Sequence, residues 1–192
     1  MKRKVYNVGV TDVGMTDGNG KHLRSYCTWN SMIERCYNKK RLEKHPTYVN
    51  CTVSDEWKLY SNFKKFYDEN YVDGLFLDKD LLQDGVVNKV YSSNTCLFVP
   101  RALNNFFTNH KSSSVSDYRG TSWKESHKKW VAQIKVNNHE TGISKVKHLG
   151  LFTDPELSEL VYDTAREIEA MKWRTVMIND YGWSSELASY IK

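Results

Sequence analysis

Two aspartates flank a lysine in the stretch LDKD at residues 77–80. Carboxylates spaced this closely can hold a divalent cation such as Mg²⁺, because carboxylate oxygens are its preferred protein ligands. Asn94 and Asn104 can each add a neutral oxygen, and the resulting chemistry would be metal-dependent hydrolysis of a phosphodiester. The alternative is a turn in which Asp78 caps backbone amides and Lys79 touches a phosphate or a neighbouring acid.

Short strands and amphipathic helices must position this stretch. GLFL at 74–77 predicts a strand that runs into the aspartates, TCLFVP at 95–100 predicts a second strand, and Pro100 precedes a helix. Upstream, apolar residues at helical spacing predict helices over 26–37 and 57–70. Their expected core-facing side chains are Trp29, Met32, Ile33, Cys36, Trp57, Tyr60, Phe63, Phe66 and Tyr67. Residues 1–22 are rich in Gly and Asp and predict an irregular lead-in.

The second half changes to strict alternation. In HKKWVAQIKVN, at 127–137, Lys129, Gln133 and Lys135 share one face of a half-buried strand. NNHETG predicts a hairpin turn, and KVKHLGLF predicts the return strand. Asp154 and Pro155 then predict the N-cap and first residue of a helix. The side chains expected to face inward from this helix are Leu157, Leu160, Val161, Thr164 and Ile168.

These elements predict an α+β chain of two parts. A helical ββα domain covers residues 1–107, a Ser-rich linker covers 108–117, and a three-stranded antiparallel sheet packed on one helix covers 118–192. Charge is unevenly distributed: residues 107–152 carry 8 Lys/Arg against 3 Asp/Glu, whereas residues 153–192 carry 4 against 8. A basic sheet backed by an acidic helix favours a polyanionic partner.

The second half resembles a known family. RGTSWKESHKKWVAQIKVN and KHLGLFTDPELSELVYDTAREI are similar to the ethylene-response-factor (APETALA-type) DNA-binding domain, in the form also found in phage and bacterial proteins. The resemblance implies that the sheet docks in the major groove of double-stranded DNA. Ser122, Lys124 and Lys135 stand where the plant proteins carry arginines, and Lys is the poorer bidentate base reader. The implied DNA contacts are Arg119, Ser122, Lys124, Lys129, Gln133, Lys135 and His148.

The first half also carries a resemblance, over most of residues 26–106. W-x-x-M-x-x-RCY, Y-x-x-C-x-V-x-x-EW, LDKD, N-K-x-YS-x-x-TC-x-FVP and LNN are similar to phage HNH homing endonucleases. In such a site a His acts as general base, and an Asp with a His or Asn from the helix holds one divalent metal. The resemblance implies Asp78 and Asp80 on the metal and Asn104 as a positioning residue. Lys79 stands where the base His is expected, and a protonated lysine cannot accept a proton at neutral pH.

Four cysteines lie at 27, 36, 51 and 96. Cys36, Cys51 and Cys96, completed by His22 or Cys27, would supply the four ligands of a structural zinc site. The alternative is that reduced cysteines fill the core. The start MKRKVYNVGV lacks a long apolar run, so we expect no secretory signal, no membrane span and a cytoplasmic setting.

Two functions therefore remain open from sequence. One is a DNA-binding nickase or endonuclease that uses Mg²⁺ or a similar metal. The other is a non-catalytic DNA-binding regulator, or an inhibitor that presents its basic sheet to a host protein.

Overall fold

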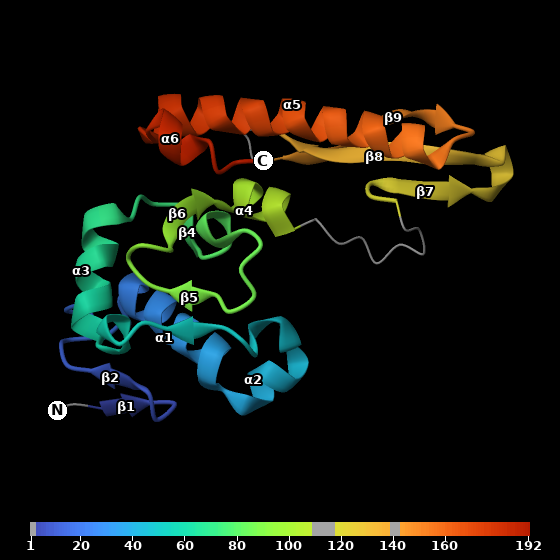
Figure 1. The fold of residues 1–192 in the computed structure, drawn as a ribbon. Coiled ribbons are helices and arrows are strands. Elements are labelled where there is room, and N and C mark those ends of the chain that lie inside the picture. The colour runs from blue at the N-terminus through green and yellow to red at the C-terminus, as the bar shows by residue number, and fades with distance from the viewer. Residues whose placement is uncertain (1–2, 109–117, 139–142) are drawn as a thin grey trace. The chain divides into compact units, whose positions relative to one another are not determined.

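The structure, a computed structural model, describes residues 3–108, 118–138 and 143–192 and divides the chain into two compact units (Figure 1). The units are Met1–Arg101 and Ala102–Lys192. Both mix helices with strands, so the predicted α+β class is confirmed. Most of α4 (Arg101–Thr108) belongs to the second unit, whereas the sequence grouped residues up to 107 with the first. Nearly all of the predicted linker, 109–117, lies outside the described residues.

The first unit is built around two helices, α1 (Arg24–Tyr37) and α3 (Tyr60–Asn70), that pack together. The side chains predicted to face the core from α1 are all buried, and the Trp29 indole N–H donates to the carbonyl of Trp57 at 2.7 Å. The other elements of this unit are β1 (Arg3–Val5), β2 (Gly9–Thr11), α2 (Lys39–Lys44), η1 (Pro46–Tyr48), β3 (Thr52–Val53), η2 (Glu56–Lys58), β4 (Leu75–Asp78), η3 (Leu81–Gln83), β5 (Val90–Tyr91) and β6 (Leu97–Pro100).

The irregular lead-in expected over residues 1–22 is wrong for its first half. β1 and β2 pair antiparallel, with Arg3 opposite Thr11 and Val5 opposite Gly9. The turn uses Tyr6 and Asn7 at φ 49° and 59°. This left-handed region is normally given to glycine, so the sequence carried no ordinary hairpin signal there.

Two further strand pairs frame the LDKD stretch. β4 and β6 pair antiparallel, with Leu75 opposite Pro100 and Asp78 opposite Leu97. β3 and β5 pair parallel over two residues each. Asp78 is thus the last residue of β4, and β6 leads directly into α4.

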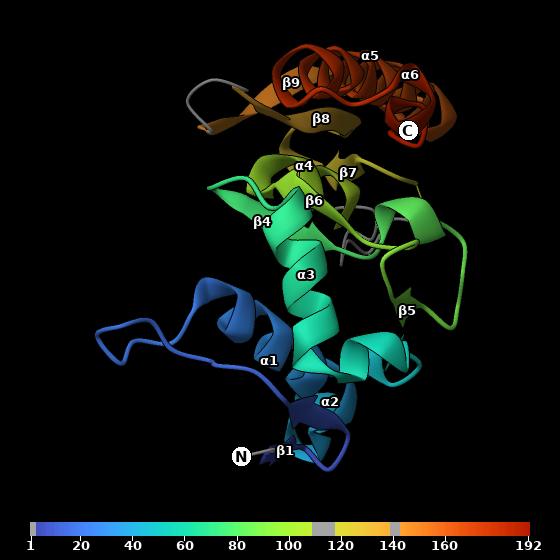
Figure 2. The same cartoon turned by 90° about the vertical axis from the view of Figure 1, so that its left-hand side faces the viewer.

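The second unit consists of a sheet of order β7-β8-β9 with a long helix on one face (Figures 1 and 2). The strands are β7 (Thr121–Lys124), β8 (Lys129–Asn137) and β9 (Ser144–Phe152), and all pairs are antiparallel. The helix is α5 (Pro155–Tyr181), and η4 (Glu125–His127), α6 (Ser185–Ala188) and most of α4 complete the unit. Residues 139–142 of the predicted hairpin turn lie outside the described residues, but Asn138 N–H donates to Ile143 O at 2.8 Å beside them.

The start of α5 is confirmed, but its predicted inward face is wrong. The Asp154 carboxylate accepts from the N–H of Glu156 at 2.9 Å, and Pro155 opens the helix. Leu157, Leu160 and Ile168, expected inside, are exposed. The buried side chains of α5 are instead Ser158, Tyr162, Arg166, Glu169, Ala170, Trp173 and Met177. The inward face of the helix carries the aromatic residues Tyr162 and Trp173 together with polar side chains, whereas Leu157, Leu160 and Ile168 lie on an outward apolar stripe.

Candidate nucleic-acid interface

Strand register divides the side chains of the second-unit sheet into two faces. Directly opposed residues in an antiparallel pair project from the same face. Ala132 and Ile134 of β8 are buried on the face that packs on α5. On the other face Lys129, Gln133 and Lys135 are exposed, whereas Val131, between Lys129 and Gln133, is buried. Their partners place Lys124 opposite Lys129 and His148 opposite Gln133. We call Ser122, Lys124, Lys129, Gln133, Lys135 and His148 the outer sheet face.

A β-bulge sets which residues of β9 join this face. Ala132 pairs with Gly150 but Gln133 pairs with His148, so Leu149 has no direct partner across the strand. A single extra residue resets the two-residue alternation of a strand. Because of this reset, His148 lies across from Gln133 and Val146 lies across from Lys135. The alternation in the sequence does not reveal this bulge.

The outer sheet face is cationic. Among the residues that the structure describes, no acidic side chain forms an ion pair with Lys124, Lys129 or Lys135. Lys128, which follows η4, is instead paired with Glu125. Three lysines without acidic partners on one surface therefore produce a net positive potential.

Arg119 does not join the outer sheet face. Its backbone N–H donates to the Glu159 carboxylate at 2.8 Å, and its guanidinium lies 3.8 Å from Asp163, also on α5. The guanidinium is also 5.9 Å from the centre of the Tyr162 ring. Arg119 thus links the start of the sheet to α5, and its DNA contact stays a prediction.

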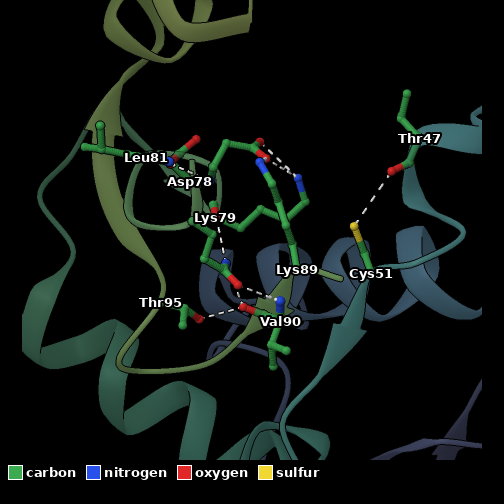
Figure 3. Close-up of polar contacts among 10 residues, drawn as sticks. Thr47, Cys51, Asp78, Lys79, Leu81, Lys89, Val90 and Thr95 are labelled. Atoms are coloured by element: carbon green, nitrogen blue, oxygen red, sulfur yellow. Dashed lines mark hydrogen bonds and ion pairs between the residues drawn. The ribbon is translucent and has the colours of Figure 1, made fainter. Parts of the chain in front are cut away.

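In the first unit, Asp78 organises a turn (Figure 3). One carboxylate oxygen accepts from the N–H groups of Asp80 and Leu81, at 2.8 Å each. The side chain is buried, and burial raises the pKa of its carboxyl above the ordinary value. Asp78 thus caps the backbone amides of a turn, which is the alternative that the sequence offered to a metal ligand.

Asp80 forms ion pairs with two lysines. The Lys79 ammonium lies 2.8 and 2.9 Å from its two oxygens, and the Lys89 ammonium lies 2.6 Å from one of them. Burial acts to raise the pKa of Asp80, but the two ammonium groups outweigh it and hold that pKa below its ordinary value. Burial acts to lower the pKa of Lys79, but Asp80 outweighs it and the pKa is raised. Lys79 is therefore a charged ion-pair partner and has no basic lone pair to offer.

The strand that follows is tied to this turn by Gln83. Its side-chain amide donates to the carbonyls of Lys79 and Val90, at 2.8 and 3.0 Å. Its carbonyl accepts from the Val90 N–H at 2.8 Å. A buried amide that forms hydrogen bonds with both the LDKD turn and β5 stabilises the segment between β4 and β5.

This donor arrangement does not fit a divalent cation at Asp78 and Asp80. A metal would have to replace two ammonium groups at Asp80 and share Asp78 with two backbone amides. Of the neutral donors, Asn94 is exposed in the turn before β6, and Asn104 lies on α4 in the second unit. The metal and positioning roles of these residues stay predictions.

The cysteines form no disulfide and three are buried. Cys36, Cys51 and Cys96 lie inside the first unit, whereas Cys27 is exposed. Burial raises the pKa of Cys36 and of Cys96 to about 12, so both thiols are protonated at neutral pH. In residues 3–108, 118–138 and 143–192, no three His, Cys, Asp or Glu side chains group closely enough to hold a metal ion. His22 packs on the ring of Tyr26 at 4.9 Å, and the zinc site stays a prediction.

No protein-family model, curated protein or solved structure matches this chain. None of the helices in the described ranges has the length and apolar character needed to cross a membrane.

Proposed function

We propose that this chain binds double-stranded DNA by laying the outer sheet face against the duplex. The observation that carries the proposal is the exposed set of Lys124, Lys129 and Lys135, which have no acidic partner among the described residues, on the sheet face turned away from α5. Each lysine that reaches a phosphate releases condensed counterions, which supplies affinity without sequence preference. The major groove is wide enough to admit a small antiparallel sheet.

Two members of the outer sheet face can read bases. Gln133 lies near the middle of β8, and a Gln side chain can bond both the N6 and N7 positions of adenine. His148 lies directly across from it and can donate or accept a single hydrogen bond. The acidic side chains of α5 favour the orientation in which the helix faces away from the phosphates.

The LDKD turn of the first unit does not favour strand cleavage. The order β4, β6, α4 agrees with the ββα order of the HNH proteins that this half resembles. Lys79, however, is a charged ion-pair partner at the position of the expected base, and Asp80 is neutralised by two lysines. We therefore propose a DNA-binding protein that does not cut.

Salt-dependent binding to duplex oligonucleotides tests the interface. Lys129→Ala and Lys135→Ala should each reduce the slope of log affinity against log salt by about one unit. Lys145→Ala is the matched control, because Lys145 is exposed on β9 but lies across from Val136, on the opposite face of the sheet. Gln133→Ala should change the preference among sequences and leave the slope unaltered. Equal slopes for Lys129→Ala, Lys135→Ala and Lys145→Ala would overturn the proposed interface.

Incubation with supercoiled plasmid and Mg²⁺ or Mn²⁺ tests the absence of cutting. The wild-type chain should leave the plasmid supercoiled. Nicking that disappears in Asp78→Ala or Asp80→Ala would show instead that the turn is an active site.

A further inference from the structure

The outward side of α5 carries a heptad pattern that the sheet does not use. Spacings of four and three residues alternate along it for three heptads, and every side chain in the set is non-polar or threonine. At 3.6 residues per turn, these positions lie on the opposite side of the helix from the buried residues Tyr162, Trp173 and Met177. We call this set the α5 seam: Leu157, Val161, Thr164, Ile168, Met171, Thr175 and Ile178.

Most of the α5 seam is exposed to solvent. Leu157, Ile168 and Met171 are 47%, 52% and 56% exposed, and Val161 and Ile178 are half-buried. Leu160, beside the seam, is 62% exposed. An extended apolar stripe of this kind marks an interaction surface, because its burial against a partner would be favourable.

The two threonines of the seam present methyl groups. The Thr164 hydroxyl donates to the carbonyl of Leu160 at 2.8 Å, and the Thr175 hydroxyl donates to the carbonyl of Met171 at 3.1 Å. Both hydroxyls are therefore satisfied within the helix, so burying these side chains leaves no hydroxyl donor unpaired.

We infer that the α5 seam joins two copies of this chain as a parallel two-stranded coiled coil. In heptad terms, Val161, Ile168 and Thr175 take the a positions, and all three are β-branched. The d positions are Leu157, Thr164, Met171 and Ile178. Ile or Val at a with Leu at d favours two parallel strands, and Val161, Ile168 and Leu157 follow that pattern.

Charges beside the seam favour a second copy as the partner. Glu167 takes a g position and Lys172 takes the e position of the following heptad. In a parallel pair, g of one helix faces this e of the other, so the pair brings Glu167 and Lys172 together twice. Both side chains are more than half exposed, and each forms its ion pair within its own helix, with Arg174 and Glu169 respectively. This dimer goes beyond the proposed DNA binding and does not depend on it.

Sedimentation of the full-length chain, without DNA, tests the dimer over protein concentrations up to about 100 µM. The wild-type chain should convert from monomer to dimer as concentration rises. Ile168→Glu should weaken association at least tenfold, since it places a charge in the centre of the seam. Val146→Glu, at an exposed apolar position on β9, is the matched control and should leave association unchanged. Circular dichroism of each variant shows that the monomer remains folded.

A charge-swap mixture tests the parallel alignment. Glu167→Lys and Lys172→Glu should each dimerise more weakly alone, because each places like charges across the seam. An equimolar mixture of the two variants should associate again, because opposite charges then face each other at both places where position 167 of one chain meets position 172 of the other. A wild-type chain that stays monomeric, an Ile168→Glu variant that dimerises normally, or a mixture that does not associate would overturn the inference. Loss of DNA binding would affect none of these readouts.

Discussion

Among the described glycines of the second unit, Gly120 leaves the least room for a side chain. It has a φ of +65°, and a Cβ added there would overlap the ring of Tyr162. Gly120→Ala therefore carries two costs. A non-glycine residue in the left-handed region costs about 1–2 kcal/mol, and forcing an extra carbon into a packed contact costs about 1–3 kcal/mol. The ring lies within a sheet–helix contact and cannot retreat freely, so we expect a total of about 3 kcal/mol.

Gly182 provides a matched control for the backbone cost. It ends α5 with a φ of +69°, and an added Cβ there would meet no atom within 4 Å. Gly182→Ala should therefore lower the free energy of unfolding by only about 1 kcal/mol, the left-handed cost alone. The difference between the two variants, about 2 kcal/mol, isolates the contact with Tyr162.

Urea denaturation followed by tryptophan fluorescence measures both variants, since Trp123, Trp130 and Trp173 all lie in the second unit. Combining Gly120→Ala with Tyr162→Ala removes the overlapping ring. The free energy of unfolding of the double variant should therefore fall by less than the sum of the decreases in the two single variants. If Gly120→Ala destabilised the unit no more than Gly182→Ala, the packing of Tyr162 over the start of β7 would be refuted.

Three further predictions concern the ion pairs and the helix start. Asp80→Ala should lower the free energy of unfolding by about 2–3 kcal/mol, measured by urea denaturation at pH 7, because it leaves the buried ammonium of Lys79 unpaired. The pKa of Asp80 is lowered in the folded chain, so the difference in free energy of unfolding between wild type and Asp80→Ala should be full above pH 3.8, the ordinary pKa. This difference should shrink as the pH falls through the lower pKa of the folded chain. A difference that stays constant down to about pH 2 would contradict the ion pairing. Arg119→Ala should lower the melting temperature and leave the salt slope of DNA binding unchanged, since Arg119 contacts α5. A reduced salt slope with an unchanged melting temperature would show instead that Arg119 contacts DNA. Asp154→Ala removes the N-cap of α5 and should lower the free energy of unfolding, measured by thermal denaturation, by about 1 kcal/mol. Thr153→Ala, at the adjacent position, should lower it by less.

Periodicity predicted the first-unit helices well, because each has one dominant apolar stripe. Trp29, Met32, Ile33 and Cys36 recur at helical spacing and are all buried. The same reasoning failed for α5, where Leu157 and Ile168 mark an apolar stripe more regular than the buried face, which includes Arg166 and Glu169. Hydrophobic spacing identifies a face that avoids water, but it does not say which of two such faces meets the protein's own sheet.

The LDKD turn shows where residue type alone is insufficient. Paired aspartates are compatible with a metal or with a turn, and the distinction depends on partners remote from the stretch. Lys89, nine residues beyond Asp80, supplies the second ammonium. The rings of Tyr48 and Tyr91 lie 5.1 and 5.9 Å from the Lys79 ammonium. These contacts depend on the pairing of β3 with β5, and no local pattern in the sequence predicts that pairing.

The distribution of thiols gives the chain a built-in reporter. Only Cys27 of the four cysteines is exposed, and none lies in the second unit. A maleimide dye should therefore modify the native chain at one position, and the other three should react only after the first unit opens. The rate of that slower modification would follow opening of the first unit alone, even while the second unit is engaged with another molecule.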